Sequence, residues 1–555
     1  MNFDTEQKLP ELRLSPLQRE RLEYRPTIPD ALRNLDGLDF QENGQVVANP
    51  QIAPTFIHMT HKPTISLTRR DVATSALRVG VVLSGGQAAG GHNVIAGLYD
   101  ALQDLHPDSK LIGFLNGSGG IVRNKSIEIT KELLANYRNQ GGFDMIGSGR
   151  TKIETPEQFR AAHRTCVDNE LDGLVVVGGD DSNTNACFLA EYFASVACKT
   201  QVVGVPKTID GDLQNKDIEL PFGFDSACKT YSESIGNIAR DCISAKKYYY
   251  FIKLMGRSAS HITLECALQT QPNLALISEE VQAKKLKLMD VIQLLVDLVR
   301  ERSKNGADYG VVLVPEGLVE FMPDVAALIR DLNRLLAQGS EDAKAVERIF
   351  DEQEKITYVF SKLSAESQNV FKSLPRDIKL QLLIDRDPHG NVQVSKIDSE
   401  RLLMQITKQE LTKVDPSIKF SCQPVFFGYE GRSCLPTNFD ANYCYSLGRL
   451  AALLVARSRS GYIASFGALS KQAEEWEPRA TPIVSMLIVE ERDGKPKAVI
   501  QKALVDLKGK AFAQFASERA AWRLKDQYCQ SGPIQYFGPR DITDSVPITL
   551  KLLRS

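Results

Sequence analysis

The hydrophobic positions of the chain fall into short continuous runs that alternate with segments of helical periodicity. The runs RVGVVL, LDGLVVV, QVVGV, YYYFIKL and YGVVLV are apolar at consecutive positions and rich in β-branched or aromatic residues. Each is followed by a turn that contains Gly, Asp or Pro, and then by a helical pattern. Strands that are apolar on both sides are typical of a parallel sheet covered by helices on both faces. In such sheets ligands bind beyond the carboxyl ends of the strands.

Three segments depart from this alternation. Residues 1 to about 75 are polar and punctuated by Pro, which predicts an N-terminal extension lying across the main body. Residues 331–419 form long charged helical stretches without the strand pattern, which indicates a helical insertion. The stretch SMLIVEERDGKPKAVI predicts a β-hairpin, because Asp-Gly is a favoured turn between two strands.

Composition and charge exclude several classes of function. The 555 residues are 43% hydrophobic, and 67 Lys+Arg against 69 Asp+Glu give a net charge of −2. A near-neutral chain has no global attraction to nucleic acid or to an anionic membrane, so an anionic ligand needs a local cluster of cations. We find no apolar run of about 18 residues and no signal-peptide pattern, and expect a cytoplasmic protein.

The ten cysteines carry little chemical signal. The chain has no C-x-x-C pair, and its thiols lie mostly inside apolar runs, as Cys187 and Cys266 do. We expect buried, inert thiols rather than disulfides or a structural zinc site. The histidines are scattered; His92 and His261 fall near turns, but each is better explained as a core or surface residue.

A glycine-rich turn, SGGQAAGGHN at 84–93, follows the first strand pattern. It is neither a G-x-G-x-x-G fingerprint nor a Walker A loop. Its glycines would let backbone N–H groups approach an anion at the start of the next helix. A tight turn without a ligand explains the motif equally well.

The turn GGDDSNTN at 178–185 places Asp180 and Asp181 between a buried strand and a helix. One acid is enough to cap a helix N-terminus. Two adjacent acids beside glycines suit a hard divalent cation held mostly through water, as Mg²⁺ is when it meets phosphate substrates. Both readings stay open, and the second is favoured.

The turn PKTIDGD at 206–212 brings Lys207, Asp210 and Asp212 into one loop after a strand. A general base for a hydroxyl should be a carboxylate that stays ionised near cations, and either Asp210 or Asp212 could serve. An Asp-Gly turn with a solvated lysine is an equally good reading of these seven residues alone.

Three later turns also carry charged side chains. Arg257 in MGRSAS could bind a phosphate through its planar guanidinium, and Glu316 in PEGL could accept hydrogen bonds from hydroxyls. GYEGRS adds Tyr429 and Arg432. For Glu316 or for the last pair alone, a structural salt bridge is the simpler explanation.

Taken in chain order, these turns resemble the phosphofructokinase family, and specifically its pyrophosphate-dependent members of the long type. The motifs are GGQAAGGHN, GGDDSNTNA, PKTIDGD, MGR, PEG and GYEGR, between residues 85 and 432. The resemblance implies two doubly wound Rossmann-like α/β domains with parallel-rich sheets, and a cytoplasmic homodimer. It also implies a glycolytic activity: Mg²⁺-dependent, reversible transfer of a phosphoryl group from pyrophosphate to the 1-hydroxyl of fructose 6-phosphate.

The resemblance also implies a division of the chain. The expected parts are an N-terminal extension (1–75), a pyrophosphate- and Mg²⁺-binding domain (76–222 and about 437–520), a fructose 6-phosphate-binding domain (223–330 and 420–436), a helical insertion (331–419) and a C-terminal segment (521–555).

Residue roles follow from the resemblance position by position. Asp210 would be the proton acceptor, Asp180 the Mg²⁺ ligand, and Asp181 and Lys207 would act in catalysis and donor specificity. The pyrophosphate-binding residues would be Gly85, Gly86, Lys207 and Arg150. The sugar-phosphate contacts would be Thr208, Ile209, Asp210, Lys247, Tyr248, Met255, Gly256, Arg257, Glu316, Tyr429, Glu430, Gly431 and Arg432. Lys247 and Tyr248 match a segment that reaches the partner's site.

The choice of donor depends on two positions. ATP-using relatives typically have glycine where this chain has Asp181 and Lys207. A carboxylate at 181 would repel the third phosphate of a nucleotide by about 4 kcal/mol at ~4 Å and an effective dielectric near 20, or about three decades in affinity. Pyrophosphate is therefore favoured over ATP.

Two alternatives remain from the sequence: an ATP-dependent 6-phosphofructokinase, and a non-catalytic polyphosphate-binding regulatory subunit. Asp180, Asp210 and Arg257 are all intact, which disfavours the second. The sequence assigns no role to Arg123 or to residues 331–419. It is also silent on allosteric control, on the preferred direction of reaction and on any assembly beyond a dimer.

Overall fold

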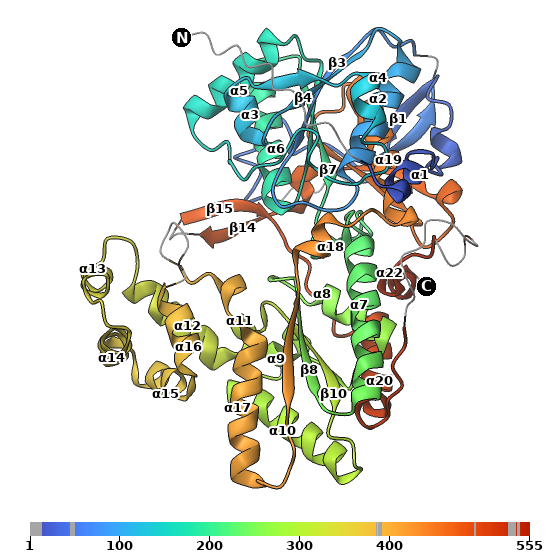
Figure 1. Ribbon diagram of the computed structural model, residues 1–555. Coiled ribbons are helices and arrows are strands. Elements are labelled where there is room, and N and C mark those ends of the chain that lie inside the picture. The colour runs from blue at the N-terminus through green and yellow to red at the C-terminus, as the bar shows by residue number, and fades with distance from the viewer. Residues whose placement is uncertain are drawn as a thin grey trace. The chain divides into compact units, whose positions relative to one another are not determined.

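The computed structural model describes residues 14–44, 50–70, 72–384, 386, 391–492, 495–530, 540 and 544–554. The chain divides into two compact units (Figure 1). Unit 1 comprises the described residues of Met1–Ala227, Tyr429–Ala503 and Ile534–Ser555. Unit 2 comprises those of Cys228–Gly428 and Leu504–Pro533.

Unit 1 contains a nine-stranded sheet in the order β1-β2-β13-β12-β7-β6-β3-β4-β5. Its five central strands are mutually parallel, and the strands at both edges are antiparallel. The central strands are β3 (Arg78–Leu83), β4 (Lys110–Phe114), β6 (Gly173–Gly178), β7 (Gln201–Pro206) and β12 (Tyr462–Gly467). The edge strands are β1 (Leu38–Glu42), β2 (Ile65–Arg69), β13 (Glu477–Pro482) and β5 (Ser126–Glu128). The parallel-rich α/β fold predicted from the apolar runs is confirmed.

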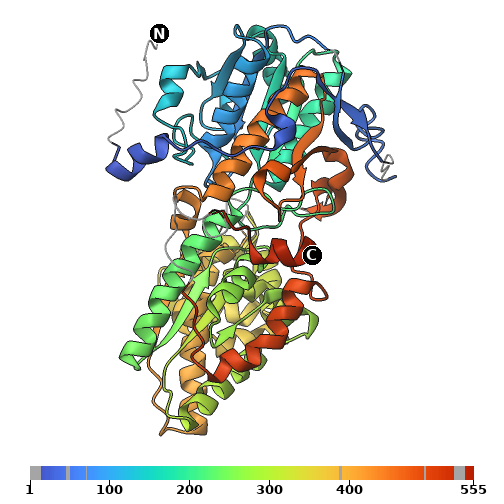
Figure 2. The same cartoon turned by 90° about the vertical axis from the view of Figure 1, so that its right-hand side faces the viewer.

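Helices cover both faces of this sheet, because successive side chains of each central strand point to opposite sides. Helices α5 (Pro156–Asp168) and α6 (Asp180–Ser195) cover one face, where Leu174, Val176 and Val202 are fully or almost fully buried against them. Helices α2 (Gly91–Leu105) and α19 (Asn438–Ala456) lie side by side on the other (Figure 2). The shorter helices are α1 (Pro16–Leu22), α3 (Ser118–Val122), α4 (Lys131–Ala135), α18 (Tyr429–Ser433) and α22 (Ile548–Arg554), with 3-10 turns η1 (Asp30–Leu32), η3 (Ala473–Glu475) and η4 (Ile483–Met486).

The N-terminal residues contribute to the core of unit 1. β2 pairs with β13, so this segment supplies two strands of the main sheet. Ile52 and Phe56 are almost fully buried in the same hydrophobic core as the central strands. Polar composition and Pro residues hid these two strands, and the expectation of a mere overlying extension missed them.

Unit 2 contains a four-stranded, all-parallel sheet in the order β11-β8-β10-β9. The strands are β8 (Tyr249–Leu254), β9 (Leu274–Ala275), β10 (Gly310–Pro315) and β11 (Cys422–Phe427), and its first helices are α7 (Phe224–Ala245), α8 (His261–Thr270), α9 (Ser278–Ala283), α10 (Leu288–Lys304) and α11 (Leu318–Phe321). α7 begins in unit 1, three residues before the boundary. In Figure 1, α7 and α17 lie on opposite sides of β8.

Most of the described residues between 323 and 414 are helical, in agreement with the helical insertion predicted over 331–419. The helices are α12 (Pro323–Leu335), α13 (Glu341–Arg348), α14 (Glu352–Lys362), α15 (Ala365–Ser373), α16 (Arg376–Ile384) and α17 (Ser399–Val414), with a 3-10 turn η2 (Val394–Lys396). Their apolar faces join one hydrophobic core with β8 and β10. Lys253 of β8 is buried, and its ammonium donates to the carbonyl of Ile397 at 3.1 Å and lies 3.3 Å from Glu400 Oε2. The segment is therefore an integral layer of unit 2.

The predicted hairpin is confirmed as β14 (Leu487–Arg492) and β15 (Lys495–Ile500), which pair antiparallel. Its Asp-Gly turn, at 493 and 494, lies outside the described residues. The Ile500 N–H donates to Thr184 Oγ1 at 3.1 Å, which attaches the end of β15 to α6.

The two units differ in extent from the expected domains. Residues 504–533 belong to unit 2, where α20 (Lys510–Leu524) accepts a hydrogen bond at Trp522 O from Asn273 Nδ2 at 3.0 Å. Residues 429–436 belong to unit 1, where Arg432 Nη1 donates to Gln87 O at 3.3 Å. Such contacts between segments far apart in sequence leave no local pattern.

None of the helices among the described residues is long and apolar enough to cross a bilayer.

Gly97 of α2 and Gly448 of α19 let these helices approach closely. A Cβ on Gly97 would lie 2.0 Å from Tyr445 O, and one on Gly448 would lie 2.1 Å from Val94 O. We expect Gly97→Ala to lower the free energy of unfolding of unit 1 by roughly 2 kcal/mol, because steric overlap outweighs the better helix propensity of Ala.

Urea denaturation followed by circular dichroism measures this loss. Gly37→Ala is the matched control: Gly37 has a φ of +65° but its Cβ would meet only Arg70 O at 3.5 Å, so it isolates a backbone cost of about 1 kcal/mol. A Gly97→Ala variant as stable as the parent chain would refute the close-packing argument.

Candidate active site

The turns singled out in the sequence meet at one edge of the sheet in unit 1. β3, β6 and β7 are adjacent and parallel, with Leu83 opposite Val177 and Gly178 opposite Pro206. The glycine turn, the Asp180–Asp181 pair and the Lys207–Asp212 loop therefore leave neighbouring strands at the same end. These three turns therefore lie at the carboxyl edge of the sheet, which is where ligands bind in parallel α/β sheets.

The glycine turn packs against two cationic side chains. Gly85 has a φ of +85°, and a Cβ there would lie 3.3 Å from Lys207 Nζ. A Cβ on Gly86 would lie 3.2 Å from Arg432 Nη1. Any larger residue at either position would crowd a cation, so the two glycines keep backbone and cations close together.

Arg150 lies at the border of this group. The Gly85 N–H donates to Gly149 O at 2.9 Å, which joins the 147–150 loop to the glycine turn. Arg150 follows directly and is exposed. The backbone therefore brings Arg150 next to the turn, and Gly85 of the same turn faces Lys207 Nζ.

Lys207 is a buried ammonium group within a cluster of charges. Lys207 is only 4% exposed. Burial and the neighbouring Arg432 guanidinium lower its pKa to about 8, while Asp210, Asp180 and Asp212 oppose the shift. An additional anion near Lys207 would favour its charged form, so the cluster is suited to binding one.

Asp180 and Asp181 occupy the first turn of α6 and face different cations. The N-cap is Gly179, which has no capping side chain, so neither acid is the N-cap. Asp180 Oδ2 lies 3.6 Å from Lys502 Nζ. Asp181 is half exposed and its Oδ2 lies 3.3 Å from Lys152 Nζ.

The structure separates the roles of Asp210 and Asp212. Thr208 Oγ1 donates to Asp212 Oδ1 at 3.2 Å, and burial followed by the nearby Asp210 raises the pKa of Asp212 to about 6. Asp210 Oδ1 is buried and accepts no hydrogen bond from the described residues, while Arg432 Nη2 lies 3.7 Å away. Asp210 is therefore the carboxylate with an acceptor oxygen available to a bound hydroxyl.

Two lysines of this site were missed from the sequence. Lys152 lies two residues after the 147–150 loop, and Lys502 lies two residues after β15, the second strand of the hairpin. Lys502 Nζ lies 3.7 Å from Asp212 Oδ2 as well as near Asp180. Neither lysine stands in a strand-end turn, so only the tertiary fold reveals them.

In unit 2, a second group of predicted residues lies at the ends of β8 and β10. Met255 and Glu316 are buried, and Arg257 is exposed. The Gly256 N–H donates to Glu316 Oε2 at 3.2 Å, so Glu316 holds the turn that carries Arg257. A Cβ on Gly317 would lie 1.9 Å from Arg257 O, which shows how closely the two turns pack.

The remaining predicted sugar-phosphate residues differ in their exposure and belong to both units. Lys247 is exposed and Tyr248 half-buried, and both precede β8, at the opposite end of the strand from Arg257. At about 3.3 Å per residue the six-residue strand separates them by about 20 Å. In unit 1, Ile209 is fully buried, and Tyr429 of α18 is 69% exposed. Glu430 is exposed and Gly431 buried.

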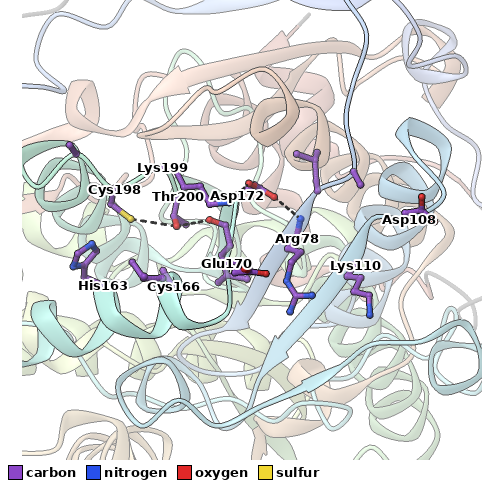
Figure 3. A pocket seen from close by; sticks show the side chains of 15 residues that line it. Arg78, Asp108, Lys110, His163, Cys166, Glu170, Asp172, Cys198, Lys199 and Thr200 are labelled. Atoms are coloured by element: carbon purple, nitrogen blue, oxygen red, sulfur yellow. Dashed lines mark hydrogen bonds and ion pairs between the residues drawn. The ribbon is translucent and has the colours of Figure 1, made fainter.

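A cavity of about 790 Å³ lies in unit 1 at the amino ends of β3, β4, β6 and β7, the opposite end of these strands from the Lys207 loop (Figure 3). Its two lysines are already paired with carboxylates: Lys110 lies 3.2 Å from Glu128 Oε2, and Lys199 lies 2.8 Å from Asp172 Oδ1. Arg78 Nε donates to the carbonyl of Asn169 at 2.9 Å.

The chain is similar to proteins of a known family. The model of the family described as phosphofructokinase matches residues 78–455. The protein named pyrophosphate--fructose 6-phosphate 1-phosphotransferase of Porphyromonas gingivalis is 48% identical over 545 residues, covering 97% of this chain and 98% of that protein. The protein of the same name of Entamoeba histolytica is 48% identical, covering 97% and 99%.

A solved structure shares the fold at low identity. The pyrophosphate-dependent phosphofructokinase from Nitrosospira multiformis aligns with a TM-score of 0.53 and 14% identity, covering 85% of this chain and 98% of that chain. At this identity the likeness supports the fold alone.

His92, from the glycine turn, is a core residue, as predicted. It is 1% exposed, Nε2 lies 3.3 Å from Asp144 Oδ1, and burial lowers its pKa to about 4. Because the unfolded chain binds this proton near pH 6.5, stability falls as pH drops from about 6.5 towards 4. We expect the stability advantage of the parent chain over His92→Gln to shrink by roughly 2 kcal/mol between pH 7.5 and 5.

Urea titrations of both proteins at several pH values measure this difference. The interval from pH 7.5 to 8.5 is the internal control, since His92 is neutral in both states there. A difference that does not change with pH would contradict the assignment of His92 as a buried neutral ring.

Proposed function

The chain belongs to the phosphofructokinase family, and on that premise we propose that it transfers a phosphoryl group from pyrophosphate to the 1-hydroxyl of fructose 6-phosphate. The products are fructose 1,6-bisphosphate and phosphate, a step of glycolysis. Relatives with this name share nearly half of their residues with the chain over almost its whole length. The observation that carries the proposal is the cluster of Lys207, Arg432 and three aspartates at the carboxyl edge of the unit 1 sheet.

The cations of this cluster suit a compact diphosphate. Lys207 Nζ and the Arg432 guanidinium border the Gly85–Gly86 turn, whose backbone N–H groups would add donors. Arg150 is a further donor-binding candidate. Lys207 is a buried point charge, and burying a charge costs free energy unless it is paired. Pairing with donor phosphate offsets that cost.

Asp181 repels the third phosphate of ATP less strongly than a carboxylate without a nearby cation would. Lys152 lies 3.3 Å from Asp181, and both side chains are about half exposed. Partial neutralisation and solvent screening reduce the repulsion of a third phosphate below the 4 kcal/mol expected for a bare charge pair. Donor choice therefore depends on Lys207 as well as on Asp181.

Asp210 is the proposed proton acceptor. Its Oδ1 has no hydrogen-bond donor among the described residues, and Arg432 Nη2 lies 3.7 Å from it. Asp210 would orient the 1-hydroxyl and take its proton while the hydroxyl oxygen attacks the donor phosphorus in line. Lys207 and the turn amides would stabilise the charge on the transferred and leaving phosphates. No covalent enzyme intermediate is required.

The residues present fit a magnesium ion. The described residues contain no group of three or more His, Cys, Asp or Glu side chains arranged to hold a metal. Mg²⁺ commonly uses one or two carboxylates together with water and substrate phosphates. Burial first, and then the charges of Asp210 and Asp180, raise the pKa of Asp212, so a divalent cation beside Asp180 would reduce the repulsion among these acids. Asp180 would hold the ion, which supplies charge neutralisation on the phosphates.

Further parts of the proposal concern the sugar phosphate and the assembly. Arg257, in the turn held by Glu316, is the proposed phosphate contact of unit 2. Lys247 and Tyr248 are proposed to reach a partner's site in a cytoplasmic homodimer, since their end of β8 is remote from Arg257. The other sugar-phosphate residues named from the family resemblance remain predictions.

One observation favours the alternative of an ATP-dependent enzyme. A cavity of about 440 Å³ adjoins the Lys152–Asp181 pair and is lined in part by Phe159 and Phe188. A flat heterocycle could enter such a space if the ion pair opened. The regulatory-subunit alternative has no such support, because Asp180 and Asp210, the proposed metal ligand and proton acceptor, are both present beside Lys207.

The first test offers each donor in turn to the purified protein with fructose 6-phosphate and Mg²⁺. We expect turnover with pyrophosphate and little or none with ATP. Asp210→Asn should lower kcat by about a thousandfold, because a general base contributes 10²–10⁴ in rate. Asp108→Asn, at the opposite strand ends, is the control. Turnover with ATP alone would refute the donor, and near-normal kcat in Asp210→Asn would refute the base.

The pKa of Lys207 predicts the pH dependence of donor binding. Since its pKa in the free protein is about 8, kcat/KM for pyrophosphate should decline above pH 8 beyond any effect of the donor's own ionisation. Lys207→Arg, whose guanidinium stays charged, should lose that additional decline. The comparison is made at identical pH values, so that pyrophosphate ionisation cancels; superimposable profiles would count against Lys207 as a donor ligand.

A further inference from the structure

Lys502 occupies a central position in the acidic part of the site. Its Nζ lies 3.6 Å from Asp180 Oδ2 and 3.7 Å from Asp212 Oδ2. Both distances exceed the 2.7–3.2 Å of a direct hydrogen bond, so the ammonium group lies between the two carboxylates as a shared counter-ion. No motif of the sequence pointed to this residue.

The backbone around Lys502 is fixed, whereas its side chain is partly open to solvent. On one side the Ile500 N–H donates to Thr184 Oγ1 at 3.1 Å, and on the other the Ala503 N–H donates to Asp212 O at 2.8 Å. The Lys502 side chain is 31% exposed, against 7% for Asp212. A long, partly exposed lysine side chain whose backbone is anchored on both sides can change partners without any movement of the hairpin.

The position of Lys502 conflicts with a second cation. Asp180 is the carboxylate proposed to hold the metal ion, and an ammonium group within 4 Å of the same oxygen repels a divalent cation there. Metal binding at Asp180 therefore requires the ammonium to withdraw. A diphosphate that arrives with the metal supplies new negative charge, with which the withdrawn ammonium can pair.

We propose that Lys502 is a specificity-determining donor ligand that exchanges partners: it neutralises Asp180 and Asp212 in the donor-free protein and moves to a phosphate oxygen of the donor when metal and diphosphate bind together. Lys502 thereby disfavours the metal alone and favours the metal–diphosphate pair. The two binding events are coupled through one side chain, and by linkage each strengthens the other. This inference rests on the proposed function for the identity of the donor.

The test measures metal binding and kinetics in Lys502→Met, which keeps most of the length of the side chain and removes its charge. With Mn²⁺ alone as the probe, followed by the signal of the unbound ion in electron paramagnetic resonance, we expect binding several-fold tighter than in the parent chain. With pyrophosphate, we expect a KM raised about tenfold and an unchanged KM for fructose 6-phosphate. A merely structural role of Lys502 would not move these two affinities in opposite directions.

Two further variants make the result specific. Lys508→Met removes the same charge from an exposed lysine whose ammonium pairs with no carboxylate among the described residues, and should leave both affinities as in the parent chain. Lys502→Arg keeps the charge and should stay close to the parent in both measurements. If Lys502→Met is unstable, Lys502→Gln replaces it as the neutral variant and is compared with Lys502→Arg in the same two measurements.

The proposal is overturned if the neutral variant binds Mn²⁺ as weakly as the parent chain or more weakly. It is also overturned if neither protein binds Mn²⁺ measurably. A pyrophosphate KM that does not change overturns it as well. Failure of the proposed function is seen separately, as absence of pyrophosphate turnover in the parent chain, and leaves the Mn²⁺ comparison readable.

Discussion

The compensation of charge around Lys207 is the interaction on which the site depends. A buried ammonium group costs free energy unless carboxylates lie close, and here Asp180, Asp210 and Asp212 oppose the fall in its pKa. The same acids would repel one another without Lys207, Arg432 and Lys502. Each charged group is therefore tolerated because of the others, and the cluster keeps both signs of charge available to a metal ion and a phosphate donor.

Strand register converts scattered motifs into this cluster. Three parallel strands end level with one another, so residues almost a hundred positions apart come within contact distance. The small residues of the turns are equally necessary, since Gly85 and Gly86 leave room for Lys207 and Arg432. Behind the sheet, Gly97 and Gly448 allow α2 and α19 to pack closely, which fixes the helix that follows the glycine turn.

Much of this arrangement was predictable, because its signals are local. Continuous apolar runs marked the strands, and Gly-rich acidic turns marked their ends. The edge strands β1 and β2 were missed, because they are short, mix polar with apolar residues and lie in a segment punctuated by Pro. Lys152 and Lys502 were missed for a different reason: their role is set by distant segments, and a lone lysine after a hairpin is indistinguishable from a solvated one. The extent of the two units depends on such distant contacts as well.

The position of the two adjacent acids explains how the fold accommodates a concentration of negative charge. Asp180 and Asp181 lie in the first turn of α6, where the helix dipole and the unpaired N–H groups favour carboxylates. Gly179 rather than an acid forms the N-cap, so neither carboxylate is committed to capping the backbone. One acid then pairs with Lys502 towards the buried side and the other with Lys152 towards solvent. Helix geometry thus assigns two chemically identical neighbours to two different electrostatic environments, which suits the two different roles proposed for them.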